Sequence, residues 1–110
     1  MWIMVAGPYT SGAADAEGRA ANLRVLAEAA LAVFRRGHVP VIGVSNALPL
    51  IECAGPDGFE EVMMPLSLAL ADRCDAILRV GGASAGADSE VERCRSLGRP
   101  VFYRVEDVPG

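Results

Sequence analysis

Apolar and polar residues alternate along the chain in blocks that are typical of strands and helices in turn. Strands of a parallel sheet are covered on both faces, so they form short, continuously apolar runs that end near glycine or proline. This pattern predicts strands at residues 2–6, 39–44, 75–80 and 100–104. Pro40 lies either at the start of the second strand or on an edge strand, because proline cannot donate a ladder hydrogen bond.

Between these runs, apolar residues recur at three- and four-residue spacing, which is typical of helices that bury one face. The first predicted helix covers residues 16–36, and the other two cover residues 59–73 and 89–97. Ser89 and Glu92 have the spacing of a capping box, which predicts the start of the third helix.

Prolines and glycines interrupt the pattern in two places. Pro65 lies inside the second predicted helix, so we expect a kink or a break there. Residues 45–58 hold several prolines and glycines and are predicted to form a long loop. Long loops in compact domains are often lids or binding loops.

The predicted elements follow the order β-α-β-α-β-α-β. Right-handed crossover connections then place helices on both faces of a parallel sheet. The sequence therefore predicts one α/β domain over residues 1–110, a small three-layer sandwich of the Rossmann or flavodoxin type with about four strands in the order 2-1-3-4. Ligands of such sheets bind beyond the carboxyl ends of the strands, where the strand order reverses. This location selects the loops at residues 7–12 and 81–90.

Composition and charge narrow the classes of function. The 110 residues are 52% hydrophobic and 22% charged, with a net charge of −4, which suits a globular protein and argues against a nucleic-acid partner. No apolar stretch approaches the ~20 residues of a membrane span, and the first residues resemble a strand rather than a signal peptide. The three cysteines are widely spaced and form no metal-ligand pair, which indicates a reducing, cytoplasmic location.

The loop at residues 7–12 follows a predicted strand and precedes a predicted helix. Glycine there lets the backbone approach a ligand, and free N–H groups near a helix start attract anions. Thr10 and Ser11 add hydroxyl groups, and Tyr9 either lines a pocket or covers the end of the sheet. The loop matches neither a Walker sequence nor a Gly-x-Gly-x-x-Gly fingerprint. A turn that only reverses the chain is therefore an equally good interpretation.

The loop at residues 81–90 consists mainly of small residues, which leave open space beside a strand end. Ser84 is a candidate to hold a substrate oxygen. Glu90 is a candidate nucleophile or base, because a carboxylate can attack an electrophilic carbon or accept a proton. Acids such as Asp88 and Glu90 are also ordinary in the first turn of a helix, and position alone favours that structural interpretation.

Other residues have simpler structural interpretations. Asp75 and His38 belong at the amino edge of the sheet, opposite the predicted site. Met63 and Met64 are typical of core packing or of a subunit contact. The predicted helix around residues 62–70 is more apolar than one buried face requires. We therefore expect a homo-oligomer, either a dimer or a tetramer.

Four short motifs are spread along the chain. They are Ala6-Gly7-Pro8-Tyr9 after the first strand, Cys74-Asp75 before the third, Ser84-x-Gly86-x-x-x-Glu90, and Gly98-Arg99-Pro100-Val101. This set resembles the nucleoside 2-deoxyribosyltransferase-like superfamily and is closest to its short branch of about this chain length. The resemblance covers nearly the whole chain, so it implies a single domain of this kind over residues 1–110.

Members of this superfamily cleave or exchange the N-glycosidic bond of nucleosides or nucleotides, often at sites completed across subunits. The resemblance implies that Glu90 attacks the anomeric carbon to form a glycosyl-enzyme, which water or a second base resolves, as in retaining glycoside hydrolysis. It implies that Ser84 contacts the 5′ oxygen or phosphate. The substrate-binding residues that it implies are Gly7, Pro8, Tyr9, Thr10, Ser84, Gly86 and Asp88. The partner it implies is a small-molecule nucleoside or nucleotide, with no metal and no cofactor.

The chain departs from the superfamily pattern at two positions. Many active members carry a tyrosine where this chain has Met4 and an aspartate where it has Ser67. Two hypotheses therefore stand: an enzyme acting through Glu90, or a non-catalytic nucleotide or sugar-phosphate binding module. A third, ranked lower, is the related Rossmann-like phosphoribohydrolases, whose Pro-Gly-Gly-x-Gly-Thr-x-x-Glu motif is matched here only by Gly81 and Gly82 and, at a different spacing, Glu90.

Overall fold

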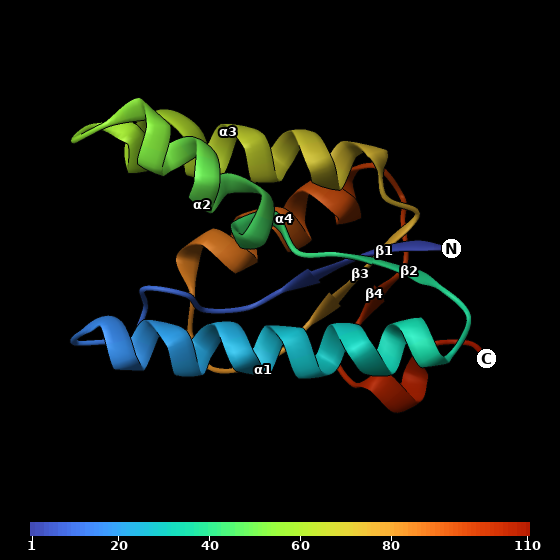
Figure 1. Ribbon diagram of the computed structural model, residues 1–110. Coiled ribbons are helices and arrows are strands. Elements are labelled where there is room, and N and C mark those ends of the chain that lie inside the picture. The colour runs from blue at the N-terminus through green and yellow to red at the C-terminus, as the bar shows by residue number, and fades with distance from the viewer.

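Four parallel strands form a sheet that lies between two helical layers (Figure 1). The computed structural model describes residues 1–110, and its elements are β1 (Trp2–Ala6), α1 (Ala16–Arg35), β2 (Val39–Val41), α2 (Gly43–Ala54), α3 (Gly58–Arg73), β3 (Ala76–Arg79), α4 (Ala85–Ser96), β4 (Val101–Phe102) and the short 3-10 helix η1 (Val105–Asp107). The strand order β2-β1-β3-β4 confirms the predicted class and topology. No helix is both long enough and apolar enough to cross a membrane.

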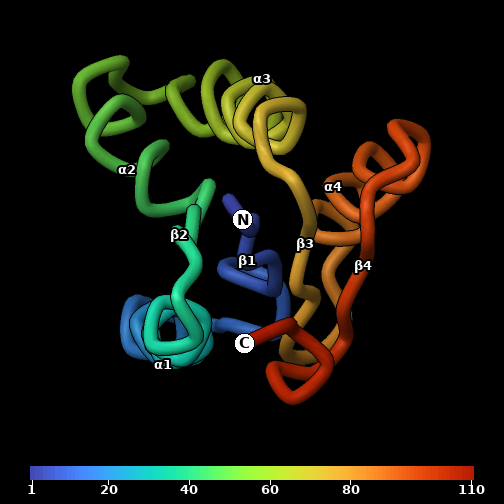
Figure 2. The backbone as a smooth tube through the Cα atoms, turned by 90° about the vertical axis from the view of Figure 1, so that its right-hand side faces the viewer, coloured from blue at the N-terminus to red at the C-terminus, as the bar shows by residue number.

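The central strand β1 is apolar because both of its faces are covered. Ile3 and Val5 pack into a core with Leu26 of α1, whereas Met4 and Ala6 pack into a second core with residues of α3 and α4. These four strand residues are at most 2% exposed. Figure 2, turned by 90° from Figure 1, shows α1 and η1 on one side of the strands and α2, α3 and α4 on the other.

The predicted long loop at residues 45–58 is wrong. β2 ends at Val41, and α2 occupies Gly43–Ala54, so the predicted second strand is also too long. Pro49 lies inside α2, where it forgoes one backbone hydrogen bond. Apolar residues at helical spacing compensate for this loss by packing against α3, and Ala47 is completely buried. Proline and glycine are typical of loops, so their presence here concealed this helix in the sequence pattern.

Two further predicted boundaries need correction. α3 continues through Pro65 without a break. α4 begins at Ala85 rather than at Ser89, because Ser84 caps it by accepting a hydrogen bond from the Ala87 N–H at 3.1 Å. Ser89 is therefore inside the helix, and its hydroxyl donates to the Ala85 carbonyl instead of forming the predicted capping box.

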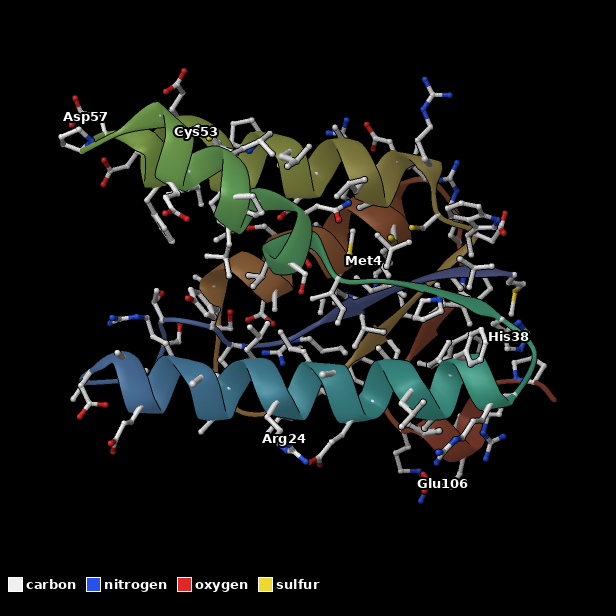
Figure 3. All side chains as sticks on the ribbon, in the orientation of Figure 1. Met4, Arg24, His38, Cys53, Asp57 and Glu106 are labelled. Carbon is white, nitrogen blue, oxygen red and sulfur yellow. The ribbon has the colours of Figure 1, made fainter.

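The helices α2 and α3 form a hairpin that extends past the carboxyl ends of the strands (Figure 1). Asp57, labelled in Figure 3, marks its outer end. The two helices approach closely at glycines: a Cβ atom at Gly43 would lie 2.6 Å from the Ser67 Oγ, and one at Gly58 would lie 2.5 Å from the Ile51 carbonyl oxygen. The hairpin therefore forms a wall beside the edge of the sheet where ligands are expected.

Asp75 and His38 lie at the opposite edge, as predicted. Asp75 Oδ2 accepts a hydrogen bond from the Trp2 N–H at 2.8 Å. His38 lies within hydrogen-bond distance of the Met1 amino group, at 2.9 Å, and of the Pro109 carbonyl oxygen, at 2.6 Å. Both side chains hold chain segments together at the amino edge.

The contact between Gly43 and Ser67 yields a prediction for stability. Gly43→Ala is expected to lower the free energy of unfolding by about 1–3 kcal/mol, because its Cβ overlaps the Ser67 hydroxyl. Ser67→Ala should be neutral or stabilising, since this buried hydroxyl has no hydrogen-bond partner. In a double-mutant cycle measured by urea unfolding, Ser67→Ala should recover part of the loss caused by Gly43→Ala. Strict additivity would contradict the proposed overlap.

Candidate functional site

A cavity of about 290 Å³ lies at the carboxyl edge of the sheet, between the β1–α1 loop, the start of α4 and the α2–α3 hairpin. It is lined by Gly7, Tyr9, Thr10 and Ser11 from the loop, by Ser84, Ala85, Gly86, Ala87 and Glu90 from α4 and its cap, and by Val44, Phe59, Met63 and Met64 from the hairpin. The two loops predicted from fold logic thus contribute to one cavity.

Most of the predicted site residues line this cavity, including Glu90, Ser84 and Thr10. Pro8 and Asp88 do not. Pro8 is buried behind the loop, where its ring lies against Gly81: a Cβ atom on Gly81 would come within 2.9 Å of the Pro8 Cδ. Asp88 is exposed and pairs with Arg79. Neither side chain is therefore placed to contact a ligand in the cavity.

The β1–α1 loop is held in place by close packing and by one side chain. Gly7 admits no side chain, because a Cβ atom there would lie 2.6 Å from the Val80 carbonyl oxygen and 2.9 Å from Leu26 Cδ2. Asn22 of α1 donates from Nδ2 to the Tyr9 carbonyl oxygen at 2.7 Å and to that of Ser11 at 3.2 Å. These contacts fix the loop residues that face the cavity. In the sequence, Asn22 stands out as the one amide side chain among the alanines and leucines of α1.

The start of α4 presents hydrogen-bond donors to the cavity. The first N–H groups of a helix have no partner within the helix, and Ala85 and Gly86 both line the cavity. The Ser84 oxygen accepts from the Ala87 N–H, which leaves its own hydroxyl hydrogen available. The positive end of the helix dipole adds to this field. This end of the cavity therefore suits an oxygen-bearing or anionic ligand group.

Glu90 is the carboxylate that lines the cavity, and it is only 9% exposed. It lies in the second turn of α4, on the face that packs toward the sheet with Ala87 and Val91. Burial raises the pKa of Glu90 from 4.5 to about 7, and the charge of Arg79 opposes part of this rise. Near neutral pH the side chain therefore exists in both protonation states, which suits nucleophilic or acid–base chemistry.

Arg79 is a site-building residue that the sequence analysis did not identify. Its side chain is 10% exposed. It donates to the Val80 carbonyl oxygen at 2.5 Å and to that of Gly82 at 2.8 Å, and its Nε lies 3.2 Å from Asp88 Oδ1. One guanidinium thus ties the end of β3 to the glycine turn and to the first turn of α4. In the sequence, the sign of this role is a single arginine at the end of an apolar strand.

The wall opposite Glu90 is apolar and comes from the hairpin. Val44 belongs to α2, a helix that the sequence analysis interpreted in part as strand and loop. Phe59, Met63 and Met64 lie in the first half of α3. Phe59 remains 41% exposed although it borders the cavity. The two methionines, predicted to serve in core packing or a subunit contact, therefore also line the cavity.

Met4 and Ser67, the two positions that depart from the superfamily pattern, do not line the cavity. Met4 is completely buried in the core beneath α3 and α4. Ser67 is 1% exposed, and its hydroxyl lies toward Gly43 without a hydrogen-bond partner. No group of three or more histidine, cysteine, aspartate or glutamate side chains comes together to hold a metal ion.

No protein-family model matches the chain, and no curated protein matches its sequence significantly.

The burial of Glu90 leads to a pH-dependent prediction. Below about pH 4.5 the carboxyl is protonated in both the folded and the unfolded chain, so Glu90→Gln should change stability little. As the pH rises from 4.5 to about 7, the unfolded chain loses this proton first, which lowers the stability of the wild type. At about pH 8, Glu90→Gln should raise the free energy of unfolding by about 3 kcal/mol.

Urea unfolding at both pH values measures this effect. Glu92→Gln is the matched control, because Glu92 lies two residues further along α4 and its side chain is 73% exposed. It should show no comparable gain at the higher pH. An equal effect of Glu90→Gln at both pH values would show that its carboxyl is not desolvated.

Proposed function

We propose that this protein cleaves or transfers the N-glycosidic bond of a nucleoside or nucleotide, with Glu90 as the nucleophile. The observation that carries the proposal is a nearly buried, partly ionised carboxylate in the cavity at the switch point of the sheet. The spacing of Ser84 and Glu90, which resembles that of the deoxyribosyltransferase-like superfamily, supplies the reaction class. The apolar wall and the polar loops supply surfaces for the two halves of the substrate.

The proposed orientation follows from the lining of the cavity. Phe59, Met63 and Met64 offer an apolar surface for the flat face of a base. The hydroxyls of Thr10 and Ser84 and the first amides of α4 offer hydrogen bonds to sugar oxygens or to a 5′ phosphate. A substrate bound in this way would span the cavity, with its anomeric carbon between the two surfaces and near Glu90.

The reaction proceeds in two displacements. An ionised Glu90 oxygen bonds to the anomeric carbon, the bond from that carbon to the base nitrogen breaks, and the base leaves with the electron pair and takes a proton from solvent. Water, or the nitrogen of a second base, then attacks the same carbon. The ester bond to Glu90 breaks, its carboxylate is regenerated, and the attacking group releases its proton to solvent.

Base release tests this proposal directly. The protein is incubated with ribo- and deoxyribonucleosides and their 5′ phosphates, and free base is measured by chromatography. Glu90→Ala and Glu90→Gln should each lower kcat/KM by at least about 100-fold, because they remove the attacking oxygen. Glu92→Gln, exposed on the same helix, should retain the wild-type rate. An unchanged rate in both Glu90 variants would exclude Glu90 as the nucleophile.

The pH dependence of the same reaction identifies the role of Glu90. Only the ionised carboxylate can attack, so kcat/KM should rise with pH and level off above the pKa of Glu90, which lies at about 7. A rate that falls through this range would instead make Glu90 a general acid. Mass spectrometry after mixing with a slow, fluorinated nucleoside should detect a glycosyl adduct on the wild type and none on Glu90→Gln.

The second candidate function is a non-catalytic nucleotide or sugar-phosphate binding module. It is favoured by the burial of Met4 and Ser67, which contribute no tyrosine or aspartate to assist a nucleophile. Such a module would be stabilised by its ligand without consuming it.

A thermal-shift panel separates this candidate from the enzyme. A ligand at 100 times its Kd should stabilise the folded protein by about 2.7 kcal/mol, with no base released. Phe59→Ala should reduce the shift, whereas Tyr103→Ala, which removes an exposed aromatic side chain that does not line the cavity, should preserve it. No shift with any nucleoside, nucleotide or sugar phosphate would count against both functions.

A further inference from the structure

The helix α1 carries an apolar stripe that the fold leaves largely uncovered, although Leu23 packs partly against the core. The stripe consists of Ala20, Leu23, Ala27, Leu31 and Phe34. Their three- and four-residue spacing places them on one flank of the helix, beside the face that packs on the sheet. Leu31 is 47% exposed and Phe34 is 63% exposed, the highest value among the large hydrophobic residues. We call this surface the α1 stripe.

The stripe is a continuous surface and not a set of isolated side chains. Ala20, Leu23, Ala27 and Leu31 line one shallow hollow, together with Arg24 and Glu28. The outward side of α1 carries these two charges as an ion pair, with Arg24 Nε 3.1 Å from Glu28 Oε1. In Figure 3 Arg24 points away from the sheet. The hollow is therefore apolar along its length and bordered by one charge of each sign.

The sequence pattern favoured a different oligomer contact, the apolar segment at residues 62–70. In the structure this part of α3 packs between α2 and α4, and its side chains Val62, Leu66, Leu68 and Leu70 are each partly buried. Its apolar character is thus largely used within one chain. The long first helix, in contrast, leaves large apolar side chains in water.

We propose that the α1 stripe is the contact surface for a second copy of this chain, with the two α1 helices antiparallel about a two-fold axis at Ala27. In this arrangement, the residue numbers of two facing side chains add up to about 54. Ala27 meets the partner's Ala27, Leu23 meets the partner's Leu31, and Ala20 meets the partner's Phe34. The largest side chain thus faces a small one, and the helices can approach closely at their middle.

The charges beside the stripe favour the same arrangement. In the antiparallel pair, Arg24 of each chain lies near the partner's Glu28, so two ion pairs join the subunits. A parallel two-fold pair would instead place Arg24 and the partner's Glu28 on opposite flanks of the contact, so these ion pairs would not form. Because the stripe matches itself in both size and charge, a second copy fits it better than an unrelated partner. The spacing of its residues is also the spacing of helices that pack side by side in antiparallel pairs.

Sedimentation velocity of the full chain over a micromolar concentration range tests the proposal. The wild type should reach twice the 11.5 kDa mass of one chain. Leu31→Glu should raise the dimer Kd by at least about tenfold, because it buries a charge in the stripe. Val25→Glu is the matched control: Val25 lies on the other flank of α1 and is 46% exposed, against 47% for Leu31. Circular dichroism should show that both variants remain folded.

Charge reversal tests the antiparallel arrangement independently. Arg24→Glu should weaken the dimer by placing like charges together, and the double variant Arg24→Glu, Glu28→Arg should restore it. A wild type that stays monomeric throughout, or equal weakening by Leu31→Glu and Val25→Glu, would overturn the proposal. Failure of the double variant to restore the dimer would overturn the antiparallel pairing. None of these residues lines the cavity, so the result does not depend on the proposed chemistry.

Discussion

The whole site depends on how closely the ends of β1 and β3 approach each other. These two strands pair in register up to Ala6 and Arg79, and β1 is followed by Gly7, where an added Cβ would overlap the Val80 carbonyl oxygen. Because no side chain fits between them, both loops leave the sheet side by side. That contact brings the Glu90 carboxyl from α4 and the hydroxyls of the β1–α1 loop to one cavity, although they are some eighty residues apart in the chain.

The α2–α3 hairpin encloses one side of this cavity. A glutamate in the second turn of α4 is buried here instead of lying in water. The apolar side chains of Phe59, Met63 and Met64 replace water on that side. Desolvation then raises the pKa of Glu90, and the tightly bonded guanidinium of Arg79 limits the rise. The same apolar side chains form one wall of the cavity.

Burial makes the stability of the fold depend on the ionisation of Glu90. A carboxyl whose pKa is raised by burial costs the folded state free energy as it ionises. A structural role would be served equally well by an uncharged residue at this buried position. The unpartnered Ser67 hydroxyl is a second buried polar group, but it lies between α2 and α3 and outside the cavity. The Ser67 hydroxyl and the Glu90 carboxyl therefore occupy separate places on the side of the sheet that the hairpin covers.

The amino-acid sequence by itself determined the sheet order, the first strand and helix, and the edge of the sheet where a ligand would bind. These features follow from local apolar periodicity and from the handedness of crossover connections, which do not depend on distant contacts. It also singled out Ser84 and Glu90, because small residues and an acid follow a strand at the switch point.

Only the tertiary structure decided which of the candidate residues face the cavity and how the site is closed. Pro49 and the neighbouring glycines suggested a loop, yet packing against α3 stabilises α2 there, since tertiary contacts outweigh the local cost of proline. The pKa of Glu90 likewise depends on how deeply the folded chain buries it, so no local pattern predicts it. The exposure of the α1 stripe is of the same kind: periodicity reveals an apolar flank, but only the folded chain shows that nothing covers it.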